Sequence, residues 1–392
     1  MDEHHLGRCR SRLWRRRHSR CRGRRLQATD AFETKATHAI ILDSGANLAL
    51  FEKDADAQFV PASMSKLMTL AVVFRQLKEG RIKLDDTFVV SENAWRTGGA
   101  PSGTAAMFAP LGDPITVNDL IQGVTVQSGN DACIILAEGI GGTEAGFVKM
   151  MNDYAKELGL TQSTFANSNG LPAEGHMMSA RDLATLAKHL IDTYPEYYHY
   201  FGQKEFRYRD KFTFRNRNPL VWADIGVDGL KTGYLKESGY GLVASAVRGD
   251  QRLILVVSGL ESKNDRQSEA RRLLEWGFKS FKPFRLFGAD EKVSDALVWG
   301  GEKHYVPLVG DGEIDLILPV TSTGAVSASI LYDGPLKAPI RKGDQVATLR
   351  VSAAESTATN EIPLYAGEDI GQSNFAMRGI DSLLVLAFGW LL

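Results

Sequence analysis

A serine and a lysine three positions apart, Ser63 and Lys66, could together perform nucleophilic chemistry. They lie in the stretch PASMSKLMT at residues 61–69. Residues at i and i+3 share one face of a helix, so a helix that begins near Ala62 would point the hydroxyl and the amine the same way. The apolar run at residues 67–77 predicts that this helix is buried, and a buried lysine is costly unless it is partnered or functional. A lysine that snorkels to solvent and a serine that only caps the helix remain the alternative.

A serine nucleophile needs a base, and the sequence offers a lysine for this role. The chain contains neither a Gly-x-Ser-x-Gly elbow nor a His-Glu-x-x-His zinc motif. Lysine acts as a base only when it is neutral, so burial or a second cation must lower its pKa from about 10.4. Lys231-Thr232-Gly233, on a predicted strand, supplies such a cation. Ser128-Gly129-Asn130, between two predicted helices, supplies a proton-relaying hydroxyl and an amide that both donates and accepts.

Charge is unevenly distributed along the 392 residues. The first 25 residues hold ten arginines against Asp2 and Glu3, and the rest of the chain has 36 basic and 45 acidic residues. A mildly acidic body gives no support for nucleic-acid binding. The arginine-rich head lacks the apolar core of an export signal, and could be a basic arm for nucleic acid or anionic lipid. We interpret it as a mistranslated or mis-started signal segment that is not folded.

Strand patterns at both ends of one long segment enclose a helical middle. A hairpin is expected at residues 38–43 and 48–52, and three strands and a helix are expected at 229–234, 241–247, 252–258 and 265–281. This order predicts a sheet completed by both ends of one domain. Residues 296–365 alternate in short runs separated by turns, which predicts a small all-β domain. We place the boundary between residues 283 and 290.

The end of the chain, residues 375–392, is apolar from Leu383 onward. This stretch is shorter than the roughly 20 residues needed to span a bilayer. Arg378 and Asp381 near its start and Trp390 near its end fit an anchor that lies in or tilts through the membrane surface. A helix docked on the body is the alternative. The expected division is therefore a head at 1–28, a catalytic domain at 29–283, a β-rich domain at 284–372 and an anchoring helix at 373–392.

Ser-x-x-Lys, Ser-x-Asn and Lys-Thr-Gly occur in that order, about 60 and about 100 residues apart. Class A β-lactamases and penicillin-binding proteins carry the same set, with Asp where Gly129 stands here. Over about residues 32–392 the chain resembles the low-molecular-mass penicillin-binding proteins that act as serine-type D-alanyl-D-alanine carboxypeptidases. The resemblance also covers residues 126–132, 169–171, 179–184, 227–233 and 332–335.

The resemblance implies an α+β fold: a β-lactamase/transpeptidase-like α/β/α sandwich with a helical subdomain, then a small all-β domain and a C-terminal amphipathic helix. It implies an enzyme of peptidoglycan and cell-wall biogenesis, which affects cell shape, at the periplasmic face of the bacterial inner membrane. The expected partners are peptidoglycan stem peptides, β-lactam antibiotics as covalent inhibitors and the membrane surface. No cofactor, metal or nucleic acid is expected.

The resemblance also implies roles for the site residues. Ser63 would be the acylated nucleophile, with its backbone N–H and that of Tyr234 as the oxyanion hole, and Lys66 would be its base. The family commonly has His at the position of Tyr234, so a side-chain role there is not carried over. Ser128 would relay a proton, and Asn130 would hold the substrate amide. The terminal D-Ala carboxylate would be bound by Lys231, Thr232, Gly233 and Arg266. Arg217 is a further candidate for this role, and a surface salt bridge is its alternative.

The activity implied is removal of the terminal D-Ala from pentapeptide stems through an acyl-enzyme on Ser63, which water then releases. A β-lactamase of the same fold is one alternative, but no Glu-x-x-x-Asn follows Ser128. D,D-endopeptidase or transpeptidase activity uses the same serine chemistry and stays open. A non-catalytic wall-binding or scaffolding protein is the alternative from another class.

Overall fold

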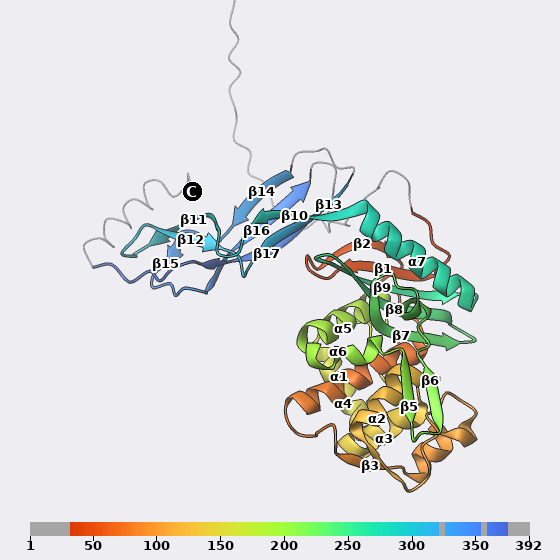
Figure 1. Cartoon of the computed structure of the whole chain (residues 1–392). Coiled ribbons are helices and arrows are strands. Elements are labelled where there is room, and N and C mark those ends of the chain that lie inside the picture. The colour runs from red at the N-terminus through yellow and green to blue at the C-terminus, as the bar shows by residue number, and fades with distance from the viewer. Residues whose placement is uncertain (1–31, 321–325, 354–358, 375–392) are drawn as a thin grey trace, which may run out of the picture.

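The computed structural model describes residues 32–320, 326–353 and 359–374. The described chain forms a sheet-and-helix unit followed by an elongated unit of strands (Figure 1). The predicted anchoring helix and the arginine-rich head fall outside the described residues.

The central sheet of the first unit has five antiparallel strands in the order β2-β1-β9-β8-β7. Its strands are β1 (His38–Asp43), β2 (Leu48–Lys53), β7 (Val227–Leu235), β8 (Gly239–Arg248) and β9 (Gln251–Leu260). Because β1 pairs with β9, the first hairpin joins strands that come some 200 residues later in the chain. The predicted sheet, completed by both ends of the domain, is confirmed.

Helices cover both faces of this sheet because its central strands bury side chains on both sides. In β1, Ala39 and Ile41 pack with the helix α7 (Lys263–Ser280), whereas Ile40 and Leu42 pack with the helical middle. That middle contains the elements α1 (Lys66–Lys78), α2 (Val117–Gln122), α3 (Asn130–Gly141), α4 (Glu144–Glu157), α5 (Ala180–Thr193) and α6 (Pro195–Gly202). Two short hairpins, β3 (Thr87–Val89) with β4 (Pro114–Thr116) and β5 (Glu205–Tyr208) with β6 (Phe212–Arg215), complete it.

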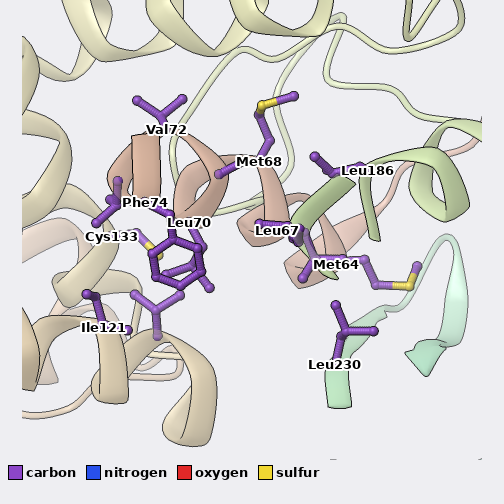
Figure 2. Close-up of a cluster of buried hydrophobic side chains, with 14 of the residues drawn as sticks. Met64, Leu67, Met68, Leu70, Val72, Phe74, Ile121, Cys133, Leu186 and Leu230 are labelled. Carbon is purple, nitrogen blue, oxygen red and sulfur yellow. The ribbon is translucent and has the colours of Figure 1, made fainter. Parts of the chain in front are cut away.

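The helix α1 is the buried centre of the helical middle. A 3-10 turn at Ala62–Ser65 precedes it, and eleven of its thirteen residues are buried. Figure 2 shows Leu67 beside Leu186, and Phe74 near Cys133, in one continuous apolar cluster. The helix that carries Lys66 is therefore fixed by packing along its whole length.

Side-chain caps define where several helices begin. The hydroxyl of Thr116 accepts a hydrogen bond from the Asp119 N–H at the start of α2. Ser179 caps α5 in the same way, through the Asp182 N–H. The helix α2 stops at Gln122, and a wider turn at Gly123–Gln127 follows it.

The second unit is all β, as the sequence predicts. A six-stranded sheet has the order β14-β16-β17-β12-β11-β15, and β10 pairs with β13 beside it. Its strands are β10 (Phe281–Phe287), β11 (Lys292–Trp299), β12 (Tyr305–Val309), β13 (Ile314–Pro319), β14 (Val326–Leu331), β15 (Leu336–Lys337), β16 (Gln345–Ala353) and β17 (Thr359–Ala366). The boundary expected from residue 283 onward falls inside β10, since this strand follows α7 directly. No helix within the described ranges is long and apolar enough to cross a bilayer.

Candidate active site

Ser63 and Lys66 meet at the start of α1. The Nζ atom of Lys66 donates to the Ser63 Oγ at 2.9 Å and to the Asn130 Oδ1 at 2.7 Å. It also donates to the backbone oxygen of Asn169. Lys66 has no exposed surface, so it does not snorkel to solvent. The buried amine lies within hydrogen-bond distance of the serine hydroxyl, so that in its neutral form it can accept the hydroxyl proton, as a lysine base requires.

Burial sets the protonation behaviour of Lys66. The pKa of its amine is lowered to about 8, chiefly by loss of solvation, and the nearby guanidinium of Arg217 contributes to this lowering. The sequence argument expected Lys231 to be the second cation. Lys231 is also buried, and its pKa is held well below the usual value by burial and then by repulsion from Lys66 and Arg217. Burial is thus the main cause of the lowered pKa of both lysines, and repulsion between cations adds to it.

The Ser-Gly-Asn triplet lies between the wider turn and α3. Ser128 adopts a left-handed backbone conformation, with φ at 64°, and is almost fully buried. The side chain of Asn130 accepts from Lys66 and donates through Nδ2 to the Thr104 hydroxyl at 2.9 Å. Asn130 is therefore oriented from both ends of its amide.

Strand β7 brings the Lys-Thr-Gly triplet against the turn that carries Ser63. A Cβ at Gly233 would lie 2.9 Å from the Pro61 backbone oxygen and 3.0 Å from the Met64 Cγ. Only glycine permits this approach without displacement. Lys231 and Thr232 are buried two residues and one residue before it, whereas the Tyr234 ring is 52% exposed and stacks on the Tyr240 ring with centroids 4.2 Å apart.

Arg217 and Arg266 complete a cluster of four cations with Lys66 and Lys231. Burial lowers the pKa of each arginine, and Arg217 lowers that of Arg266 further. Arg266 lies in the first turn of α7 and is 8% exposed, and its Nε lacks a hydrogen-bond partner. In the described part of the chain no carboxylate forms an ion pair with any of the four. The surface salt bridge considered for Arg217 is not found there.

Three contacts at the site were not predicted from the sequence. The Asn169 carbonyl reaches Lys66 from a loop in which Gly170 has φ at 77°. The buried Asp131 carboxylate accepts from the Met107 N–H at 2.9 Å and the Ala109 N–H at 3.2 Å, which ties the loop before α2 to α3. The sequence motifs include positions 130 and 169, next to these contacts. The contacts themselves join residues far apart in the chain and therefore have no local sequence signal.

Metal ligands do not gather at this site. Within the described ranges, no three His, Cys, Asp or Glu side chains are grouped so that they could hold a metal ion. The groups at the site are hydroxyls, polar amides and four basic side chains, one of which is the buried amine of Lys66.

Comparison with known proteins gives consistent matches. The sequence profile described as D-alanyl-D-alanine carboxypeptidase matches residues 25–262, and that described as penicillin-binding protein 5, C-terminal domain, matches residues 281–372. The chain is 39% identical over 368 residues to D-alanyl-D-alanine carboxypeptidase DacC of Escherichia coli, covering 93% of this chain and 91% of the relative. For DacA of the same organism the identity is 34%, covering 90% and 87%.

Solved structures agree with these matches. Penicillin-binding protein 5 of Haemophilus influenzae aligns with a TM-score of 0.80 and 33% identity, covering 88% of this chain and 100% of that one. Penicillin-binding protein D2 of Listeria monocytogenes, solved in its ampicillin-bound form, aligns with a TM-score of 0.55 and 28% identity, covering 64% of this chain and 100% of that one. The predicted α+β fold of the penicillin-binding proteins, with an all-β C-terminal domain, is confirmed.

Gly233→Ala tests the close approach of β7 to the serine turn. The added methyl must displace β7 or the turn, which overpacking studies place at about 1–3 kcal/mol of lost stability. Because such a shift misplaces reacting groups, covalent labelling by a fluorescent penicillin should slow roughly tenfold to a hundredfold. Labelling is measured on a gel against time.

Gly45→Ala is the matched control, since its Cβ would meet only the Asp43 Oδ1, at an ordinary 3.6 Å. This control should be labelled at the wild-type rate. If the Gly233→Ala protein is labelled at the wild-type rate, the contact between β7 and the serine turn does not position the site.

Proposed function

Since the chain belongs to the family of D-alanyl-D-alanine carboxypeptidases, which are penicillin-binding hydrolases of the cell wall, we propose that Ser63 is its nucleophile and Lys66 the base. The observation that carries this proposal is the 2.9 Å hydrogen bond between a fully buried Lys66 amine and the Ser63 hydroxyl. The substrate is the pentapeptide stem of peptidoglycan, from which the terminal D-Ala is removed.

In the acylation step the Ser63 Oγ attacks the carbonyl carbon of the penultimate D-Ala, and its proton passes to neutral Lys66. The C–N bond then breaks, and the leaving D-Ala amine takes a proton from Lys66 through the Ser128 hydroxyl. Water next attacks the ester carbonyl carbon and gives a proton to Lys66; the bond to the Ser63 Oγ then breaks, Lys66 returns the proton to this oxygen, and the shortened peptide leaves. The backbone N–H groups of Ser63 and Tyr234 stabilise the oxyanion in both steps. The packing of β7 on the serine turn supports this last assignment.

The cluster of four cations receives the terminal carboxylate of the substrate. Lys231, Thr232 and Gly233 on β7, with Arg217 and Arg266 beside them, form an electropositive pocket that has no anion of its own among the described residues. A bound carboxylate favours the charged form of Lys231, with which it forms an ion pair. Asn130 holds the substrate amide through its oriented side chain.

Among the residues that the structure describes, no glutamate forms a hydrogen bond with Ser63 or Lys66, which does not favour a β-lactamase. Class A enzymes use a glutamate to activate water for deacylation. Glu174, in the loop that contacts Lys66, is exposed to solvent. Slow release of β-lactams, and therefore inhibition by them, is the expected behaviour.

Ser63→Ala tests the nucleophile. Wild-type protein is expected to release D-Ala from a muramoyl-pentapeptide and to gain the mass of one penicillin, whereas the Ser63→Ala protein should do neither. Ser65→Ala is the control, because its hydroxyl donates to the Ala62 backbone oxygen and not to the cleft. Equal D-Ala release by wild type and Ser63→Ala would overturn the mechanism.

The pH dependence tests the base. Since Lys66 has a pKa of about 8 and is active when neutral, kcat/KM should rise with pH through about 8 and fall roughly tenfold per unit below it. Arg217→Gln removes a cation that lowers this pKa, so the midpoint of the penicillin acylation profile should move to higher pH. A kcat/KM that does not change between about pH 6 and about pH 9 would contradict a lysine base.

We propose that the protein works in the periplasm at the inner membrane, with residues 29–283 as the catalytic domain, 284–372 as a β-rich domain and 373–392 as the anchor. The apolar end of the sequence supports this attachment.

Removal of residues 375–392 should shift the protein from sedimented vesicles to the supernatant, while removal of residues 1–28 should not. Equal membrane binding with and without residues 375–392 would refute the anchor.

A further inference from the structure

A second cleft of about 440 Å³ lies near the active site, between the loop that precedes α2 and the hairpin β5–β6. We propose that it is an accessory subsite for the glycan end of the substrate: a sugar ring packs on its aromatic walls, and a neighbouring carboxylate pairs with Lys211. This inference rests on the proposed function, since it concerns the part of the stem peptide farthest from the scissile bond.

Aromatic rings form the walls of the cleft. Trp95 and Phe108 contribute from the loop side and Phe212 from β6. Phe108 stacks on Phe212 with ring centroids 5.3 Å apart, and Phe212 stacks on Phe214 at 5.8 Å. Flat apolar faces of this kind suit the C–H face of a sugar ring, and apolar walls with a few polar groups are typical of ligand sites.

Phe108 adopts a left-handed backbone conformation, with φ at 63°, which is unusual for a bulky residue. Its loop wraps the buried Asp131 carboxylate, which accepts from the N–H groups of Met107 and Ala109 and also from that of Phe108. This attachment holds the Phe108 side chain, which is 41% exposed, at the wall of the cleft.

The rim of the cleft is positively charged. Residues 204–215 contain five basic and two acidic side chains, on a body that is acidic overall. Arg209 pairs with Asp113 at 2.7 Å, whereas Lys211 forms no ion pair within the described ranges, and its Nζ lies 5.5 Å from the centre of the Phe212 ring. Lys211 is therefore available to a carboxylate next to the aromatic walls, and stem peptides carry such carboxylates.

The cleft is connected to the catalytic residues through a short stretch of backbone. Its wall residue Ala109 donates to the Asp131 carboxylate at 3.2 Å, and Asp131 follows Asn130. The Asn130 N–H donates to the Ala105 backbone oxygen at 2.7 Å in the same loop. An extended stem of five residues spans at most about 17 Å, so the proposal requires the sugar to lie within that reach of the carboxylate at Lys231.

The test compares two substrates, a muramoyl-pentapeptide and the same pentapeptide without its sugar. For Trp95→Leu and Lys211→Gln, the ratio of kcat/KM for the muramoyl over the free peptide should fall about tenfold from the wild-type ratio. Lys204→Gln, on the same hairpin but outside the cleft, should leave the ratio unchanged. If both substrates lose activity equally, the cleft acts only through the loop that holds Asn130, and the inference is wrong.

A binding measurement separates this inference from the proposed function. Muramoyl-tripeptide, which lacks the D-Ala-D-Ala end, should bind the full-length Ser63→Ala protein by calorimetry, and Lys211→Gln in that background should weaken binding about tenfold. No binding, or equal binding by both proteins, would overturn the subsite whatever the hydrolysis assays show. Binding without any D-Ala release by the wild type would instead refute the proposed function alone.

Discussion

The structure depends on the burial of an amine, that of Lys66, at the centre of the helical middle. A charged ammonium ion in such a place is costly, because the interior solvates it poorly. The protein meets this constraint in two ways: burial lowers the pKa to about 8, and three oxygens, from Ser63, Asn130 and Asn169, receive the hydrogen bonds of the amine. The lowered pKa reduces the cost of burying the amine, and it also makes the neutral form, which can act as a base, accessible near neutral pH.

Keeping water away from this amine requires close packing of segments distant in the chain. The loop of Asn169 and the strand β7 both press against the turn before α1, and glycines at 170 and 233 make that approach possible. Ala62 and Ser128 hold left-handed backbone conformations next to the reacting groups. Such conformations persist only where the surroundings fix them, and here an apolar core along α1 does so.

The sequence alone predicted the parts of the site that local spacing controls. The i and i+3 rule placed Ser63 and Lys66 on one face, and strand alternation with helix caps gave most of the first unit. The resemblance to a family indicated the fold, the three triplets and their roles. The Asn169 carbonyl and the Asp131 contacts were beyond reach, because backbone oxygens and buried carboxylates at long range leave no periodic pattern. The lowering of the Lys66 pKa by Arg217 was also not predicted, because it depends on two segments that are far apart in the chain.

The electrostatics also bear on why the enzyme would cut at the end of a chain. Basic side chains gathered without an anion among the described residues repel one another when charged, and a terminal carboxylate would relieve this repulsion, whereas an internal peptide bond brings no charge. In the proposed mechanism this carboxylate pairs with Lys231 and favours its charged form. Preference for a carboxy-terminal residue would then follow from the charge of the pocket, while the neutral Lys66 beside Ser63 performs the proton transfer.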